Sequence, residues 1–328
     1  MHSELQTAIY AEDQKYQDEI HRGLRKVFEV SKYLDFPFTL DEVTTYFLPE
    51  GQVTEEELRD LITREDFADL PFQIRDGYIF AGEAKSAAAR LEREQFSASK
   101  LGSATEFATV LTRLVPFIST IAVTGSVAYG SARKWDDIDL FIVTKQNRLW
   151  VSAFLTLVLI RLSKLLHLRP SYLLQFCLSY VHDELGFVNE SQRSKSNMLF
   201  ARELLKAQPI AGIDQYRSFL EQNSWINSVY SKAYPVKLKQ LEQRAGPRKS
   251  EDGSHSPLLS FLMDWAEGFA FAFLSRYLRL RAYLTNLQLK SRGERLRIFE
   301  PKTSPRSCVY TSNFYRWLQA LWSDESVP

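Results

Sequence analysis

The 328 residues are enough for two or three domains, and 45% of them are hydrophobic and 13% aromatic, which excludes a globally disordered chain. Lys and Arg number 41 against 40 Asp and Glu, so the net charge gives no general attraction to nucleic acid, although it is compatible with a local basic patch. The two cysteines, Cys177 and Cys308, lie far apart and form no zinc-binding pattern, so we expect reduced thiols in a cytoplasmic protein.

Residues 1–83 have the pattern of a winged-helix-like domain, which is three helices followed by a β-hairpin. Apolar residues at helical spacing predict the first helix over 14–33. Capping-box patterns that begin at Thr39 and Thr54 predict the starts of the second and third helices. An Asp-Gly pair at 76–77, between two short β-rich runs, predicts the turn of the hairpin.

The third of these helices, where a winged helix would read DNA, is acidic. Its charged residues are Glu55, Glu56, Glu57 and Asp60 against Arg59 and Arg64. An acidic helix is repelled by DNA phosphates, so we expect this domain to pack or to contact protein, and we expect no specific DNA binding.

A helical connector over 84–116, stopped by Pro116, is expected to lead into a core domain over 117–190. The elements expected in this core are a strand at 120–124, a short helix, a strand at 137–143, an apolar helix at 150–168 and a strand at 171–182. The apolar run 151–160 is followed at once by Arg161. About ten residues are too few to cross a bilayer, so we expect a buried helix and no membrane span.

Residues 191–328 predict a C-terminal helical region that is interrupted by a polar loop at 244–257. One long helix is expected over 258–290, with aromatic residues at helical spacing. We expect these aromatic residues to form the core of a helical bundle rather than a surface for base stacking; they are Phe261, Trp265, Phe269, Phe271 and Phe273.

The most informative pattern of the chain is a glycine-serine turn followed by two aspartates. An apolar run leads into Gly125 and Ser126, and Asp137 and Asp139 lead into a second apolar run. Backbone N–H groups that no bulky side chain covers can hold phosphate oxygens beside a hydroxyl. Residues two apart in a strand point to one face, so the two carboxylates should lie side by side, as ligands of Mg²⁺ often do. Each half alone is also typical of an ordinary turn and a solvated strand end.

This combination resembles the signature of the DNA polymerase β-like nucleotidyltransferase superfamily over residues 118–144. The resemblance implies an α+β fold with a small mixed-sheet core. It also implies that Asp137 and Asp139 hold Mg²⁺, and that Gly125 and Ser126 contact a nucleoside triphosphate. Members of the superfamily usually carry a third carboxylate on a later strand.

Asp183, at the end of the expected 171–182 strand, is our candidate for this third catalytic carboxylate, and its alternative interpretation is an ordinary turn residue. The strand itself carries Cys177, Ser179 and His182 where a strand-borne carboxylate would be expected. Arg133 and Lys134, just before the acidic strand, are candidates for further phosphate contacts.

Together these patterns predict Mg²⁺-dependent transfer of a nucleoside monophosphate from a nucleoside triphosphate to an acceptor. The acceptor is open between a small molecule, a protein side chain and an RNA end. Two alternatives remain, a nucleotide-binding sensor without catalysis and a nucleic-acid-binding regulator led by the winged-helix-like domain.

Overall fold

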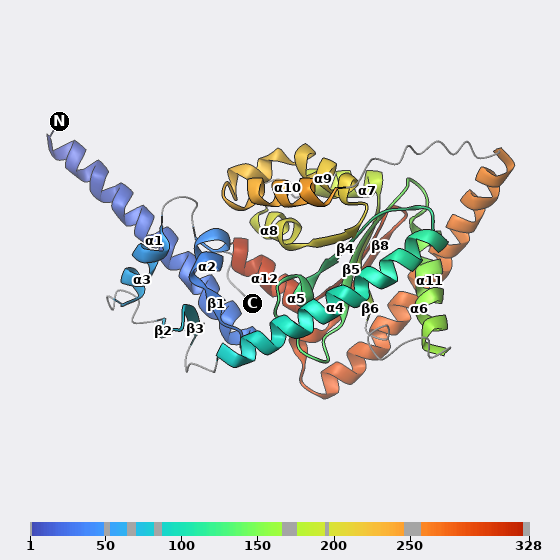
Figure 1. Ribbon diagram of the computed structural model, residues 1–328, viewed down its shortest axis with the longest axis horizontal. Coiled ribbons are helices and arrows are strands. Elements are labelled where there is room, and N and C mark those ends of the chain that lie inside the picture. Colours follow the sequence, from blue (N-terminus) through green and yellow to red (C-terminus); the bar gives the residue numbers. More distant parts are fainter. Residues whose placement is uncertain are drawn as a thin grey trace. The chain divides into compact units, whose positions relative to one another are not determined.

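The computed structural model describes residues 2–48, 53–63, 70–81, 87–165, 176–193, 197–245 and 257–323 (Figure 1). The chain forms two compact units. The first comprises Met1–Glu92 and Ile226–Val236, and the second Arg93–Trp225 and Lys237–Pro328. Among the described helices, none combines the length and the apolar character that crossing a bilayer requires.

The first unit contains helices and a small antiparallel sheet in the order that the sequence predicts. Its elements are α1 (His2–Leu34), β1 (Phe38–Thr39), α2 (Leu40–Tyr46), α3 (Glu55–Thr63), β2 (Phe72–Arg75) and β3 (Tyr78–Ala81). Strand β3 pairs with both β1 and β2. The expected hairpin is present, and its turn residues Asp76 and Gly77 have φ of 53° and 79°. Whether this unit acts as a winged helix stays a prediction.

Both predicted capping boxes are confirmed. The Glu42 side chain accepts from the Thr39 backbone N–H at 2.9 Å, and the Thr39 hydroxyl accepts from the Glu42 N–H at 3.1 Å. Thr54 and Glu57 make the same exchange at 2.8 and 3.2 Å. Each pair satisfies donors that the first turn of a helix leaves unpaired, so α2 and α3 begin where the local sequence directs.

The second unit is built on a six-stranded mixed sheet with the order β7-β4-β5-β6-β9-β8. The strands are β4 (Ile118–Thr124), β5 (Ile138–Thr144), β6 (Phe176–Asp183), β7 (Gln208–Ala211), β8 (Phe299–Ser304) and β9 (Ser307–Ser312). Strands β5 and β6 are parallel and the other neighbours are antiparallel. This arrangement confirms a mixed α+β fold.

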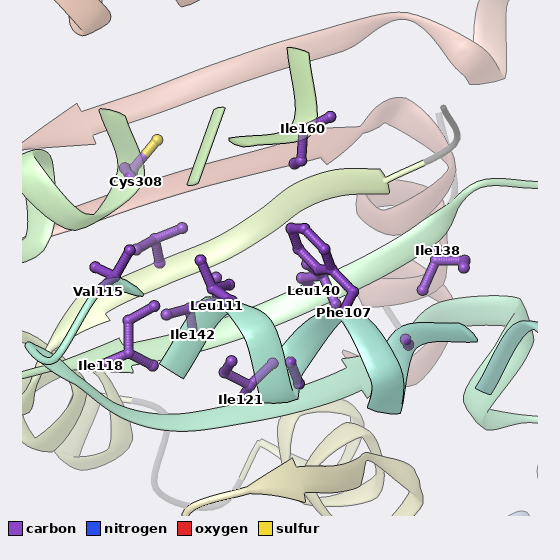
Figure 2. Packing of buried hydrophobic residues seen from close by; sticks show 14 of the residues in the cluster. Phe107, Leu111, Val115, Ile118, Ile121, Ile138, Leu140, Ile142, Ile160 and Cys308 are labelled. Atoms are coloured by element: carbon purple, nitrogen blue, oxygen red, sulfur yellow. The ribbon is translucent and has the colours of Figure 1, made fainter. Parts of the chain in front are cut away.

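Helices cover both faces of this sheet. The helical elements are α4 (Ala87–Leu114), α5 (Gly125–Ala128), α6 (Leu149–Leu165), α7 (Glu184–Arg193), α8 (Met198–Lys206), α9 (Ile213–Gln222), η2 (Ser224–Ser228), α10 (Ala233–Arg244), α11 (Pro257–Ser291), η3 (Arg295–Arg297) and α12 (Asn313–Ser323). On one face, Leu111 of α4 packs with Ile121 and Leu140 of the central strands (Figure 2). On the other face, Phe141 of β5 meets Phe187 of α7, with ring centroids 4.8 Å apart.

The segment after residue 190, which we expected to be helical, also supplies three strands of the sheet. Strand β7 lies at the sheet edge and pairs only with β4. Its Pro209 has no backbone N–H to donate, and an edge strand tolerates this because it has a neighbour on one side only. Strands β8 and β9 form a hairpin that joins β6. These strands are short and only partly buried, so their local pattern is weak, and pairing with β4 and β6 determines their structure.

The predicted long helix is confirmed as α11, but the expected burial of its aromatic residues is wrong in part. Phe271 is partly buried against the core, whereas the other four are exposed: Phe261, Trp265, Phe269 and Phe273. The small or aliphatic residues Ala270 and Leu274 occupy the face that packs on the core, and this turns the aromatic residues away from it. The expected strand residues 171–175, the helix end at 166–168 and most of the 244–257 loop lie outside the described residues.

Candidate functional site

The glycine-serine turn begins at the end of β4, directly beside the acidic strand β5. The antiparallel register pairs Thr124 with Asp139, and α5 starts at the next residue, Gly125. Gly125 has φ of 64°, and a Cβ atom built on it would overlap Oδ2 of Asp139. Only glycine fits this backbone conformation and this close approach, so the turn and the carboxylate are parts of one site.

Three potential ligand atoms meet at this site. Side-chain atoms of Asp137, Asp139 and Cys177 all lie within 4.8 Å of one another. Cys177 is the direct neighbour of Asp139 across the parallel β5–β6 pair. The hydroxyl of Ser179, also on β6, donates a hydrogen bond to Oδ1 of Asp139. The structure therefore brings the two predicted carboxylates together and adds a thiol and a hydroxyl from the next strand.

The pKa values of this cluster are raised first by burial and then by neighbouring negative charge. Burial raises the pKa of Asp139 well above its ordinary value, and the charges of Asp137 and Glu203 raise it further, against the opposing Ser179 hydrogen bond. The pKa of Asp137 is also raised, first by desolvation among the surrounding protein atoms, although its side chain reaches solvent. Burial raises the pKa of the Cys177 thiol well above its ordinary value. A bound cation would relieve this repulsion.

Helix α4 fixes the loop that carries the chain from the turn to β5. The buried Lys100 ammonium donates to the carbonyl of Lys134 at 3.2 Å and to the carbonyl of Asp136. The backbone N–H of Arg133 donates to the Asp136 carboxylate at 2.8 Å. Burial lowers the pKa of Lys100, and the charges of Asp136 and Asp137 oppose this shift. The predicted phosphate contacts, half-buried Arg133 and exposed Lys134, thus lie on an anchored loop next to the carboxylates.

Asp183 does not join Asp137 and Asp139. It lies at the far end of β6, where it is in register with Thr144, the last residue of β5. Its buried carboxylate accepts hydrogen bonds from the N–H groups of Gly186 and Asn147, at 2.7 and 3.2 Å.

The contacts of Asp183 give this buried carboxylate a structural role that requires no part in catalysis. The Arg306 guanidinium donates to the second Asp183 oxygen at 3.3 Å. The neighbouring Glu184 accepts from the Ser119 hydroxyl at 2.7 Å. The strand end that suggested a third catalytic carboxylate therefore carries a buried group that ties β6, α7 and the β8–β9 turn together.

A different carboxylate, Glu203 on α8, lies near the site and was missed by the sequence analysis. The hydroxyl of Tyr129, which follows α5, donates to Glu203 at 2.6 Å. The Glu203 charge acts on Asp139, and burial raises the pKa of Glu203 itself. The Arg202 guanidinium lies over the Tyr129 ring, 5.0 Å from its centroid. No local pattern links Glu203 to the glycine-serine turn or to the two aspartates, because they are far apart in sequence. The only sequence feature that pointed to Glu203 was its position beside Arg202 on an amphipathic helix.

Comparison with known families bears on this geometry. Residues 104–203 match the family model described as a nucleotidyltransferase domain, and the match spans Gly125, Ser126, Asp137, Asp139 and Glu203. The predicted resemblance is therefore confirmed for this segment, which belongs to the DNA polymerase β-like nucleotidyltransferase superfamily. No curated protein and no solved structure matches the chain.

Proposed function

We propose that this chain, with its nucleotidyltransferase domain, transfers a nucleoside monophosphate from a nucleoside triphosphate to a hydroxyl or phosphate acceptor. In this reaction an acceptor oxygen bonds to the α-phosphorus, the bond from that phosphorus to the bridging oxygen of the β-phosphate breaks, and pyrophosphate leaves. The observation that carries the proposal is the fit of Gly125 against Asp139, which joins a small-residue turn to a pair of carboxylates.

The residues present fit a divalent cation. Asp137 and Asp139 offer hard oxygen atoms, which Mg²⁺ prefers; burial raises the pKa of both carboxylates, and the charge of Asp137 raises the pKa of Asp139 further. When bound, Mg²⁺ neutralises charge on the phosphates and on the leaving group. The two carboxylates would hold the ion, and the Ser179 hydroxyl fixes the orientation of Asp139. Cys177 would lie beside a magnesium ion without being a favourable ligand, because thiolates suit softer metals.

The remaining parts of the site suit the phosphates. Ser126 and the backbone N–H groups of its turn would contact the β- and γ-phosphates. Arg133 and Lys134 would add positive charge from the anchored loop, whose position Lys100 holds through two backbone carbonyls. These contacts involve only the phosphates, so they do not distinguish one nucleobase from another. Other parts of the chain must select the base and the acceptor.

A second candidate function, nucleotide binding without turnover, is favoured by one observation. Cys177 occupies the position beside Asp139 on the neighbouring strand, where a carboxylate would complete a set of three. A site with two carboxylates can hold a metal–nucleotide complex without activating an acceptor hydroxyl. Release of pyrophosphate separates this function from transfer.

The proposal is tested by nucleotide binding and pyrophosphate release. Titration calorimetry with each of the four nucleoside triphosphates, with and without Mg²⁺, should show binding that depends on Mg²⁺. The double variant Asp137→Asn/Asp139→Asn should lose it, while Asp214→Asn, on α9, should bind as the parent does. Magnesium-dependent binding that survives in the double variant would refute the site.

The choice between transfer and binding alone is tested by Cys177→Asp, with Cys177→Ser as the matched control. A third carboxylate should tighten Mg²⁺ binding at least tenfold and lower the thermal stability of the metal-free protein, since three like charges then share the site. If the parent binds nucleotide and releases no pyrophosphate with any acceptor class, while Cys177→Asp does, the sensor function is favoured. Turnover by the parent establishes the enzyme.

A further inference from the structure

Helix α11 exposes many apolar side chains along one face that the nucleotide site does not use, with exposed Arg276 and Arg279 between the two groups of them. We name this face the outer stripe; its residues are Phe261, Leu262, Trp265, Phe269, Phe273, Leu280, Tyr283, Leu284 and Leu287. Trp265 is 71% exposed, Phe261 67% and Phe269 63%. Single exposed apolar residues are normal, but nine on one face of one helix mark an interaction site.

The helix already has its own buried face, so the outer stripe is a second apolar face. Ala270, Leu274 and Ala282 are buried on the inner side, where α11 packs against α6. A helix that is apolar on both sides is typical of one that is covered on both sides. The outer stripe therefore needs an occupant that this chain's described second unit does not supply.

The stripe is held in a defined conformation. The rings of Trp265, Phe269, Phe273 and Tyr277 follow one another at four-residue spacing, with centroids 6.2–6.5 Å apart and planes within 13° of parallel. Helix α6 supports this ladder, since the Arg161 guanidinium donates to the Tyr277 hydroxyl at 3.0 Å. A preorganised surface loses little side-chain entropy when it binds.

Glu267 and Asp264 fix the other end of α11 to α6. The Glu267 carboxylate accepts from the backbone N–H groups of Trp150 and Val151, at 2.6 and 2.9 Å. Asp264 forms an ion pair with Arg148. The two helices thus present the outer stripe as one rigid surface.

We propose that the outer stripe is the interface of a symmetric dimer in which α11 packs antiparallel against α11 of a second copy of the chain. Five of the nine side chains are aromatic, with about 150–250 Å² each, and four are smaller leucines; at about half to two-thirds exposure they present about 900 Å² per copy. Two copies would bury about 1,800 Å² together, the size of a standard stable interface.

Two copies of the outer stripe that run in opposite directions place aromatic residues opposite aliphatic residues. Its first half is aromatic and its second half is mainly aliphatic. Antiparallel pairing about a point between Leu274 and Ser275 places Phe269 of one copy against Leu280 of the other, and Trp265 against Leu284. At these two levels a large flat ring meets a branched aliphatic side chain, as a self-complementary two-fold interface requires.

The charges beside the stripe support the same direction. Arg276, Arg279 and Arg281 lie in the second half, whereas the first half, Phe261 to Phe273, contains no basic residue, and its acidic residues Asp264 and Glu267 are engaged with Arg148 and the start of α6. Antiparallel packing sets the arginine-containing half against the half without basic residues, whereas parallel packing would set each arginine against its own copy. An anionic lipid surface fits less well, because the most exposed aromatic residues lie in the half without basic residues.

The test measures the molar mass of the full chain in solution by light scattering after gel filtration. The concentrations run from about 1 to about 100 µM, which covers micromolar dimer dissociation constants. The parent should be dimeric, and Phe269→Glu and Leu280→Lys should each be monomeric with unchanged circular dichroism. Leu114→Glu, an equally exposed position on α4, should stay dimeric.

Mixing the two variants tests the antiparallel register. A Phe269→Glu copy and a Leu280→Lys copy place glutamate against lysine once and leave the parental Phe269–Leu280 contact once, so the mixture should recover the dimer. Parallel packing predicts no recovery. A monomeric parent overturns the proposal, as does a parent whose dimer survives Phe269→Glu. A monomer that sediments with phosphatidylserine vesicles and loses this property in Phe269→Glu would assign the stripe to lipid instead.

Discussion

Gly125 and Asp139 lie so close that a single Cβ atom on the glycine would overlap the aspartate carboxylate. The contact follows from the antiparallel register of β4 and β5, which sets Thr124 opposite Asp139 and starts the turn one residue later. The absence of a side chain at 125 therefore serves two purposes, a left-handed backbone conformation and room for a carboxylate.

The substitution Gly125→Ala should disturb both the left-handed backbone conformation and the space for the Asp139 carboxylate. The positive φ costs about 1–2 kcal/mol for an alanine, and displacement of Asp139 adds to it, so we expect a loss of about 2–4 kcal/mol of unfolding free energy. Magnesium-dependent nucleotide binding should fall with it. The matched control is Gly77→Ala, which has φ of 79° and no atom within 4 Å of the new Cβ, and which should lose only about 1–2 kcal/mol. Equal losses in the two variants, measured by chemical denaturation, would contradict the steric argument.

Asp183 should prove structural. Asp183→Asn removes the charge that the Arg306 guanidinium meets and weakens the hydrogen bonds from Gly186 and Asn147. We expect a loss of about 2–3 kcal/mol of unfolding free energy, because buried hydrogen bonds to a charged group are the costly ones to remove. Nucleotide affinity at a temperature where the variant stays folded should be unchanged.

The neighbouring Glu184→Gln is the comparison for Asp183→Asn. Glu184 is exposed and keeps its hydrogen bond from Ser119 as a glutamine, so its effect on stability should stay below about 1 kcal/mol. A tenfold or larger loss of Mg²⁺ affinity in Asp183→Asn alone would return this residue to the catalytic set.

His182 should make the fold sensitive to acid. Burial lowers the pKa of His182 from 6.5 to about 4, and its ring packs between Phe141 and Phe187. In this range the unfolded chain binds a proton that the folded chain does not, so stability falls as the pH drops from 6.5 towards 4. The full effect is about 3 kcal/mol, since one pKa unit corresponds to about 1.4 kcal/mol.

The measurement is the unfolding free energy of the parent and of His182→Gln from pH 7 to pH 4. The variant is expected to be less stable at pH 7, because it loses ring packing, but its stability should depend less on pH across this window. The same pH slope in both proteins would show that His182 is not the responsible group.

Local patterns predicted the features that local physics determines. The capping boxes at Thr39 and Thr54, the Asp-Gly hairpin turn and the proximity of two aspartates at the start of β5 each depend on residues within a few positions of one another. The expectation that the turn at Gly125 and the acidic strand form one site came instead from the resemblance to the superfamily.

Features that depend on distant parts of the chain could not be predicted in this way. Strand β9 pairs with β6, more than a hundred residues earlier, and β8 joins the sheet through β9. The aromatic residues of α11 repeat at a spacing that is equally compatible with a buried and an exposed face. Only the small residues Ala270 and Ala282, which allow close packing on the inner side, indicate which face is buried.

The search for a third carboxylate shows most clearly that local patterns do not predict contacts between distant parts of the chain. Asp183 follows the expected strand and was the natural candidate from the chain order, yet the parallel register carries it to the far end of β6. Glu203 reaches the site because β7 pairs with β4 and thereby brings the end of α8 to the turn. That pairing contains a proline and is only four residues long, so it left no recognisable strand pattern.

Glu203 is expected to supply the negative charge that activates the acceptor, and this prediction depends on the proposed transfer reaction. Glu203→Gln keeps an oxygen that can accept from the Tyr129 hydroxyl, but it cannot take up a proton. Pyrophosphate release should therefore fall about 10²–10⁴-fold, the usual contribution of a general base, while nucleotide affinity should change little.

Tyr129→Phe is the complementary variant, because it keeps the Glu203 carboxylate and removes its hydrogen-bond donor. It should retain most of the turnover if the charge of Glu203 is what matters, and it should lose turnover if Glu203 only orients the residues after the turn. Mg²⁺ affinity, measured without nucleotide, gives an independent readout, since removing the Glu203 charge near Asp139 should weaken cation binding only modestly. Parental turnover in Glu203→Gln would leave the carboxylate with a structural role alone.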